Sequence, residues 1–196
     1  MLLLAALFIG LALGMATGGR IGNLANLRFR WPFFVLAVLL IKEVGVITPL
    51  SRVDGAQIVY AVSLAALIAW TIWHVDLLPG VWLVSIGAAL NLVVVAANGG
   101  RMPVAPELAA RGSHILVDQG IVGQYMLMGP DTHLNWLADW LALPGPLGTW
   151  LPEAYSPGDL VVALGIAVVA FLATKRRPGP DSILGETSAR IVSDPP

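Results

Sequence analysis

Two ionisable residues in an otherwise apolar stretch are the first candidates for chemistry. Lys42 and Glu43 lie near the middle of residues 33–50, where most other side chains are apolar. A charge at the centre of a bilayer costs about 2.5–3.5 kcal/mol on insertion scales, so such a residue usually serves a site or is paired. Neighbouring residues on a helix point about 100° apart, so at least one of the two must face a bundle interior or water. The pair fits a substrate, ion or proton site. It also fits a structural pair in which Lys42 extends toward the headgroups and Glu43 bonds to another helix.

Asn91 is a second polar candidate in apolar surroundings. It lies within residues 79–97, and its amide needs hydrogen-bond partners in a hydrocarbon environment. One interpretation is that it lines a cavity together with Lys42 and Glu43. The alternative, which is the commoner role of such residues, is a hydrogen bond that joins two helices.

Asn98 and Arg101 complete the candidate ligand-binding set. Asn98 is followed by Gly99 and Gly100, and these residue types end helices by adopting the left-handed conformation. That explanation does not cover Arg101, the cation at this boundary. Its guanidinium suits a lipid phosphate, a carboxylate substrate or Glu43, although a terminal arginine also serves as a simple anchor.

The residues that could support catalysis or bind a metal form no recognisable motif. His114, Asp118, Asp131 and His133 are the acid–imidazole set of the later part of the chain, but their spacing matches no metal signature. The chain has no cysteine, no nucleophile elbow and no zinc-protease motif. We therefore predict no catalytic residue, no metal and no cofactor.

Composition sets the class of protein that must position these residues. Hydrophobic residues make up 57% of the 196 residues and charged residues only 12%, whereas soluble domains carry about 25% charge. The net charge of −1 gives no basic signal for nucleic acid. We expect one all-α membrane domain over residues 1–174 and a disordered cytoplasmic tail over residues 175–196.

Five apolar stretches are long enough to cross a bilayer, which requires about 17–25 residues. The fifth begins with helix-start signals: Ser156 suits the cap, Pro157 the first helical position and Asp159 the first turn. The first is not preceded by Lys or Arg, which argues against a signal peptide. The predicted spans are residues 1–17, 33–50, 56–73, 79–97 and 157–174.

Charge placement predicts the orientation of these spans. Cations cluster after the first span and after the last one, and acids predominate between the fourth and fifth. Lys and Arg favour the cytoplasmic side, so the N-terminus is expected outside and the C-terminus in the cytoplasm of a multi-pass membrane protein. The inner cations are Arg20, Arg28, Arg30, Lys175, Arg176 and Arg177, and the outer acids are Glu107, Asp118, Asp131, Asp139 and Glu153.

The segment of residues 98–156 is too long to be a simple loop between two helices. As a helix, residues 132–143 would carry one narrow polar stripe, and residues 115–128 are also apolar enough for an interfacial or re-entrant helix. We therefore predict a helical cap over the outer mouth of the bundle. On the inner side, His74 and Asp76 fall in a short loop and are expected to be solvated.

Glycines mark the first span and the turn that follows it. Gly10, Gly14 and Gly18 recur every four residues and would give this helix a smooth face for close packing. Residues 18–24 are glycine-rich but are not preceded by a strand or followed by Gly-Lys-Ser/Thr. They predict a tight turn rather than a phosphate loop.

Three of these motifs together resemble a known family. Residues 18–24 (GGRIGNL), residues 98–104 (NGGRMPV, with Asn91 before them) and residues 156–159 (SPGD) are similar to the bacterial membrane-protein family called domain of unknown function 5317. The resemblance extends from the first span to the start of the fifth and does not include the tail. It implies a bacterial envelope setting and carries no activity, cofactor or catalytic residue.

Three functional hypotheses follow, in order of preference. The first is a non-catalytic membrane protein that binds a lipid or small amphipathic ligand, or docks on a larger membrane complex. The second is a transporter or channel component that uses Lys42, Glu43 and Asn91. The third is an enzyme acting on lipid headgroups at the outer face, with Arg101 as an anion clamp.

Overall fold

The computed structural model describes residues 1–27, 29–31, 33–34, 37–38, 55–109 and 124–176, and these are mostly helical, as predicted. Their long helices coincide with four of the five apolar stretches of the sequence. Most of residues 33–50, including Lys42 and Glu43, lies outside the described residues. The four long helices are α1 (Leu2–Ala16), α3 (Ala56–Trp73), α4 (Val81–Ala97) and α7 (Pro157–Lys175).

Length and composition separate α7 from the other three helices. Within the described part of the chain, α7 is the helix that is both long and apolar enough to cross a membrane. The helices α1, α3 and α4 are apolar but shorter.

The helix α7 begins at the residue that the sequence predicts, with Ser156 as its N-cap. The Ser156 side chain accepts a hydrogen bond from the Asp159 N–H at 2.9 Å, and the Asp159 carboxylate accepts one from the Ser156 N–H at 3.1 Å. This reciprocal capping box leaves neither N–H without a partner, and Pro157 takes the first helical position.

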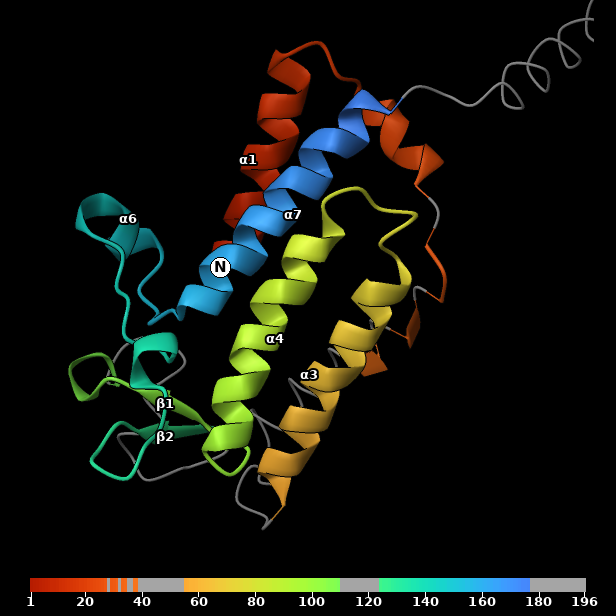
Figure 1. Ribbon diagram of the computed structural model, residues 1–196. Coiled ribbons are helices and arrows are strands. Elements are labelled where there is room, and N and C mark those ends of the chain that lie inside the picture. The colour runs from red at the N-terminus through yellow and green to blue at the C-terminus, as the bar shows by residue number, and fades with distance from the viewer. Residues whose placement is uncertain (28, 32, 35–36, 39–54, 110–123, 177–196) are drawn as a thin grey trace, which may run out of the picture.

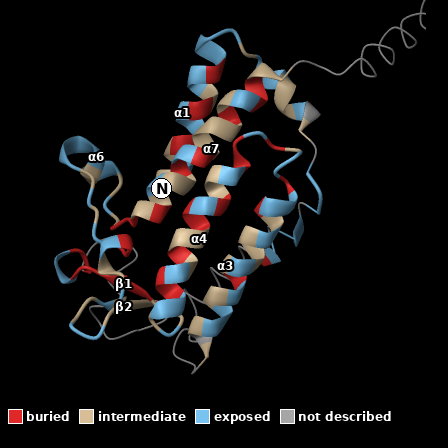
Figure 2. Ribbon diagram, viewed as in Figure 1, coloured by how far each residue is buried: buried red, intermediate tan, exposed pale blue. Residues whose placement is uncertain are grey.

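The helix α7 is central to the bundle. It packs against both α1 and α4, and α4 packs against α3 (Figure 1). Buried residues line the contacting sides of α4 and α7, while the outward sides of α1 and α3 are largely exposed (Figure 2). Glycines allow the close approach: a Cβ on Gly87 of α4 would lie 2.6 Å from the Gly158 carbonyl oxygen of α7.

The glycine face predicted for the first span is correct at two positions and wrong at the third. Gly10 packs on the backbone of Ala167, and Gly14 packs on Thr174, with no room for a Cβ at either. Gly18 has open space around it and takes φ 88°, because it begins the turn instead of continuing the helix. Its neighbour Gly19 is the residue that packs on Thr174. The chain then forms the short helix η1 (Ile21–Asn26).

The described residues 99–109 and 124–155 form a cap beside the end of α4 (Figure 1). The prediction of a helical cap is wrong, because the centre of the cap is a two-stranded parallel sheet. Its strands are β1 (Met102–Val104) and β2 (Tyr125–Leu127), and its helices are the short η3 (Pro106–Leu108), η5 (Asn135–Leu137) and α6 (Gly145–Trp150).

The predicted helix over residues 132–143 is also wrong. Leu134 takes φ 57°, which interrupts any helix there. The Asp139 N–H donates to the Pro103 carbonyl at 3.0 Å, and the Asp139 carbonyl accepts from the Ala105 N–H at 2.9 Å. This segment therefore borders β1 as a further extended chain. A helix would leave those buried backbone groups of β1 without partners, which is more costly than losing the helical hydrogen bonds.

Candidate functional site

The candidate site lies where the cap meets α4 and α7. Asn91 of α4 is buried beside the first turn of α7. Its Nδ2 donates to Asp159 Oδ1 at 2.8 Å, and its Oδ1 accepts from Ser156 Oγ at 2.8 Å. Gly158 makes room for this contact, since a Cβ there would overlap the Asn91 carboxamide. Asn91 thus joins two helices, which is one of the two roles that its position in the sequence allows.

Asn98 fastens the cap to the end of α4. Its Nδ2 donates to the Val94 carbonyl at 2.8 Å and to the His133 carbonyl at 2.9 Å, and its Oδ1 accepts from the His133 N–H at 2.8 Å. The side-chain amide pairs with the His133 peptide group much as a neighbouring strand would. Gly99 (φ 65°) and Gly100 (φ 91°) then take the predicted left-handed conformation.

Arg101 and Gln124 are the residues that immediately precede β1 and β2. Each has a buried side-chain polar atom. The backbone of the two segments meets here, since the Met102 N–H donates to the Gln124 carbonyl at 2.8 Å. Within the described part of the chain, neither Arg101 Nε nor Gln124 Oε1 has a hydrogen-bond partner. This donor and this acceptor are open to a partner from outside the described residues.

The buried phenol of Tyr155 and the half-buried phenol of Tyr125 lie in the same region. Burial, together with the nearby Glu153 and Asp159 carboxylates, raises the pKa of Tyr155 to about 12. Burial also raises the pKa of Tyr125 well above its usual range, with Asp139 and Asp159 adding to the shift. Both phenols stay protonated near neutral pH, so neither serves as a base there.

The structure divides the five residues of the predicted binding set. Asn91 lies at the α4–α7 contact, and Asn98 and Arg101 lie beyond the last turn of α4. Lys42 and Glu43 lie outside the described residues, so a shared cavity with Asn91 stays a prediction.

The acid–imidazole set is likewise divided. His114 and Asp118 lie outside the described residues, and Asp131 and His133 are exposed in a turn of the cap. The described residues contain no group of three or more His, Asp or Glu side chains placed to hold a metal ion.

The expectation that His74 is solvated is wrong. Its side chain is 0% exposed and stacks on Trp70 with 3.7 Å between ring centroids. Its Nε2 accepts from the Arg30 N–H at 2.8 Å, so Nδ1 carries the proton and donates to the Trp70 carbonyl at 2.8 Å. The Trp70 indole in turn donates to the Arg30 carbonyl at 2.9 Å. The four-residue spacing of Trp70 and His74 could have indicated this contact from the sequence, because it places both side chains on one helix face. Asp76 is exposed, as expected.

Within the part of the chain that the structure describes, four cations gather at the end of the bundle opposite the cap, here called the cationic end. The side chains of Arg30, Lys175 and Arg176 each donate to a backbone carbonyl, and Arg20 is joined through its backbone N–H. The contacts are Arg20 N–H to the Thr174 carbonyl (2.9 Å), Arg30 Nη1 to the Trp73 carbonyl (3.2 Å), Lys175 Nζ to the Thr17 carbonyl, and Arg176 Nη1 to the Leu77 carbonyl (2.9 Å).

Comparison with known proteins gives one family and no relative of known function. No curated protein matches the chain, and no solved structure does. The match to the family model begins at residue 26, so the glycine-rich turn at residues 18–24 lies outside it, contrary to the extent expected from the sequence. Asn91 and the motifs at residues 98–104 and 156–159 lie inside it. Since the match covers residues 26–171, most of the 196-residue chain, the protein belongs to the family of unknown function DUF5317.

Proposed function

We propose that the chain is an integral protein of the bacterial cytoplasmic membrane that binds a lipid-like ligand and catalyses no reaction. In this proposal it has five spans, with the N-terminus and the cap outside and the cationic end in the cytoplasm. The observation that carries the proposal is the distribution of its surface side chains. They are apolar along the helices, cationic at one end and mostly acidic among the ionisable groups of the cap.

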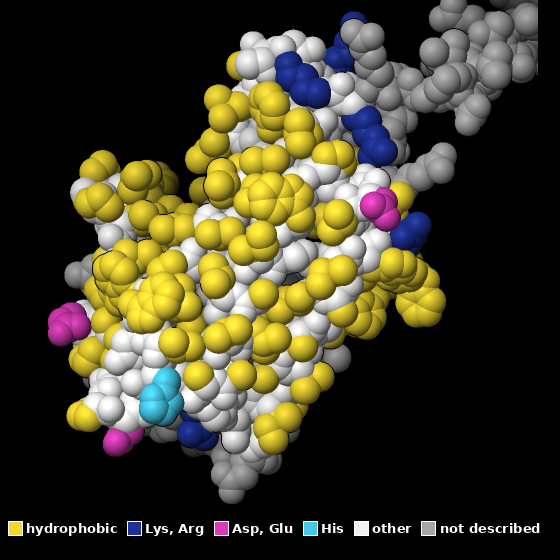
Figure 3. All heavy atoms as spheres, viewed as in Figure 1, with side chains coloured by type: hydrophobic (Ala, Val, Ile, Leu, Met, Phe, Trp, Pro, Cys, Tyr) yellow, Lys and Arg dark blue, Asp and Glu magenta, His cyan; other side chains and the backbone are white. Residues whose placement is uncertain are grey.

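Large apolar side chains are exposed on every long helix. Figure 3 shows them spread over the helical part of the visible face, with few charges between the two ends. Monomeric soluble proteins rarely expose contiguous apolar patches of more than a few hundred Å². A bilayer would cover such a surface. The exposed residues include Leu4, Phe8 and Leu13 on α1, Ile58, Val62 and Ile72 on α3, Trp82 and Ile86 on α4, and Leu164 on α7.

Charges at the two ends of the molecule support the orientation. Among its described residues, the cationic end carries four basic side chains and one exposed acid, Asp76. The described cap carries Glu107, Asp131, Asp139 and Glu153 against Arg101. Basic residues collect on the cytoplasmic side of membrane proteins, so the cap is assigned to the outside.

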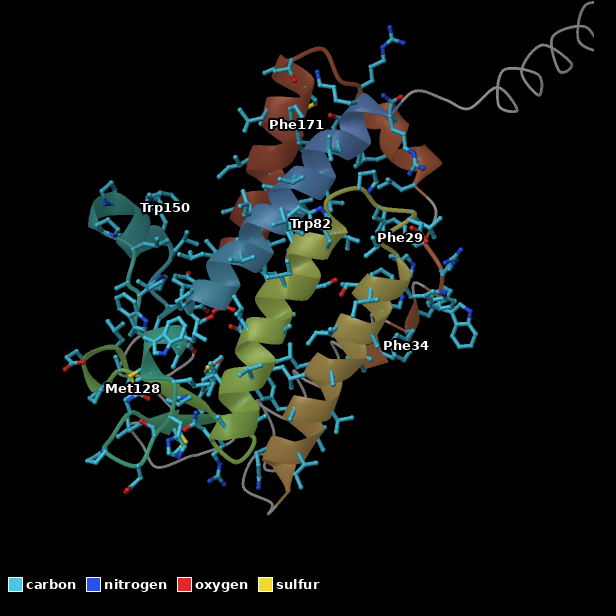
Figure 4. All side chains as sticks on the ribbon, viewed as in Figure 1. Phe29, Phe34, Trp82, Met128, Trp150 and Phe171 are labelled. Atoms are coloured by element: carbon cyan, nitrogen blue, oxygen red, sulfur yellow. The ribbon has the colours of Figure 1, made fainter. Side chains whose placement is uncertain are left out.

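Exposed tryptophans on the cap support a position at the membrane surface. Trp136 and Trp140 are exposed beside the sheet, and Trp150 is 81% exposed on α6. Figure 4 shows Trp150 on α6, which stands off from the long helices. Indole rings favour the headgroup level, where the ring is buried and its N–H stays hydrated.

The contacts of the candidate site support binding over catalysis. The amides of Asn91 and Asn98 form hydrogen bonds that hold the helices and the cap together. The phenols of Tyr125 and Tyr155 are protonated near neutral pH. The transporter hypothesis depends on Lys42 and Glu43, and no contact of the described residues favours it.

The absence of cysteine makes the orientation directly testable. Asp131→Cys in the cap and Asp76→Cys at the cationic end each introduce a single thiol at an exposed aspartate. We expect a membrane-impermeant maleimide to label Asp131→Cys in intact cells, and to label Asp76→Cys only after the membrane is permeabilised. The opposite pattern would overturn the orientation. Recovery of the protein in the soluble fraction would overturn membrane insertion itself.

A further inference from the structure

A pocket of about 190 Å³ opens at the cationic end, beside the C-terminal part of α7. An apolar cavity of about 150 Å³ is enough to hold a benzene ring, so this pocket has room for part of an acyl chain. Its apolar walls come from the end of η1, the loop between α3 and α4, and α7. The wall residues are Leu27, Leu78, Pro79, Val169, Leu172 and Ala173.

Two cations complete the lining of this pocket. Lys175 and Arg176 belong to it, and each is ordered by donating one hydrogen bond to a backbone carbonyl, of Thr17 and Leu77 respectively. An ammonium has three donors and a guanidinium five, so both keep donors for another acceptor. Among the described residues, no carboxylate forms a salt bridge with either cation.

From this combination we infer that the pocket binds an anionic phospholipid from the cytoplasmic leaflet. The phosphate accepts hydrogen bonds from Lys175 and Arg176, and the upper part of one acyl chain lies on the apolar wall. A zwitterionic lipid such as phosphatidylcholine would bring its own quaternary ammonium beside the two cations, and free phosphate would leave the apolar wall exposed to water. The inference rests on the proposed membrane insertion and names the ligand class and the site.

Native mass spectrometry in mild detergent tests the site without a charged bilayer surface. The purified full chain is incubated with equal amounts of phosphatidylglycerol and phosphatidylcholine carrying the same acyl chains, and the retained lipid is counted. We expect about a tenfold preference for phosphatidylglycerol, because the choline cation of phosphatidylcholine would be repelled by Lys175 and Arg176. The double variant Lys175→Gln/Arg176→Gln should lose this preference. Val169→Phe, which fills the pocket, should lower retention of the lipid with no change of charge.

Arg20→Gln is the matched control, since Arg20 is exposed at the same end but does not line the pocket. It should keep the wild-type preference. The inference is overturned if Arg20→Gln loses as much preference as the double variant, or if the wild type retains both lipids equally. It is also overturned if inorganic phosphate raises the melting temperature as much as phosphatidylglycerol does.

Two further measurements separate loss of the lipid site from unfolding and from failed membrane insertion. Each variant is melted without lipid first, and if the double variant is unfolded, Arg176→Gln and Val169→Phe decide the question. The thiol-labelling assay, made in cells on the Asp131→Cys and Asp76→Cys proteins, separates the two proposals. A protein that is inserted but shows no lipid preference refutes only the lipid site, whereas a protein that is not inserted refutes the proposed function.

Discussion

The Asp159 carboxylate bonds to two elements at once. One oxygen accepts from Asn91 Nδ2 on α4, and the other accepts from the Ser156 N–H at the start of α7. Ser156 Oγ closes the ring, because it accepts from the Asp159 N–H and donates to Asn91 Oδ1. Three side chains thus share one closed set of hydrogen bonds, in which each bond orients the next. The N-terminal capping box of α7 is thus held in place by a side chain of α4.

This ring predicts that Asn91→Ala destabilises the fold. The substitution removes the acceptor of the Ser156 O–H and the donor to one Asp159 oxygen. A lost bond of this kind costs about 1–3 kcal/mol when a buried group is left unpaired. We expect a lower melting temperature in detergent. Val93→Ala, at an exposed position of α4, should stay within about 0.5 kcal/mol of wild type.

A double-mutant cycle with Ser156→Ala checks that the loss comes from the ring. Groups in one hydrogen-bond network couple by about 0.5–3 kcal/mol. Strictly additive losses for Asn91→Ala and Ser156→Ala would show that the two side chains contribute independently.

At the scale of the helices, small residues decide how closely α7 approaches its neighbours. Gly10 and Gly14 face α7 from α1, and Gly87 faces it from α4. In the membrane setting that we propose, water does not drive helices together, so close packing and hydrogen bonds across the contact carry the association. The helix α7 therefore depends on positions where a methyl group cannot fit.

Gly87→Ala tests this dependence by the sign of its effect. Helix propensity alone predicts stabilisation by about 0.5–1 kcal/mol. Packing predicts the reverse, because the new Cβ would lie 2.6 Å from both the Gly158 oxygen and the Val162 nitrogen, and overpacking costs about 1–3 kcal/mol. We expect a net loss in thermal melting. Gly22→Ala is the control, since it has nothing within 4 Å and should not lower the melting temperature. A stabilised Gly87→Ala protein would contradict the close contact between α4 and α7.

At the scale of the whole molecule, a side-chain amide and an apolar cluster join the described part of the cap to α4. The Asn98 amide holds the His133 peptide group, and the apolar cluster of Val94, Val95 and Met102 packs between α4 and the sheet. The cap can therefore loosen at its Asn98 side without unfolding the helices, because the α1–α7 and α4–α7 contacts lie elsewhere.

Asn98→Ala should loosen the cap selectively. We expect faster amide hydrogen exchange in residues 124–139 and little change in α7. His133→Ala offers a sharp control. Asn98 binds the His133 backbone while the His133 side chain is exposed, so this variant should leave exchange unchanged. Equal exchange in the Asn98→Ala and wild-type proteins would show that the apolar cluster holds the cap without the amide.

The sequence by itself determined the features that depend on neighbours along the chain. Ser156, Pro157 and Asp159 specify the start of α7, and Asn98 with its two glycines specifies the end of α4, because capping bonds form within one helical turn. The apolar stretches specify the long helices for the same local reason.

Only the tertiary structure decided which distant groups pair. The apolar segment around Asp139 borders β1 instead of forming a helix, since the buried backbone of β1 needs its hydrogen bonds. His74 is buried because Arg30, 44 residues earlier, supplies a donor to its ring. Asn91 could be recognised as needing a partner, but only folding placed Asp159 and Ser156 beside it. Local composition sets where helices begin and end, whereas the pairing of buried polar groups is set by contacts between segments far apart in the chain.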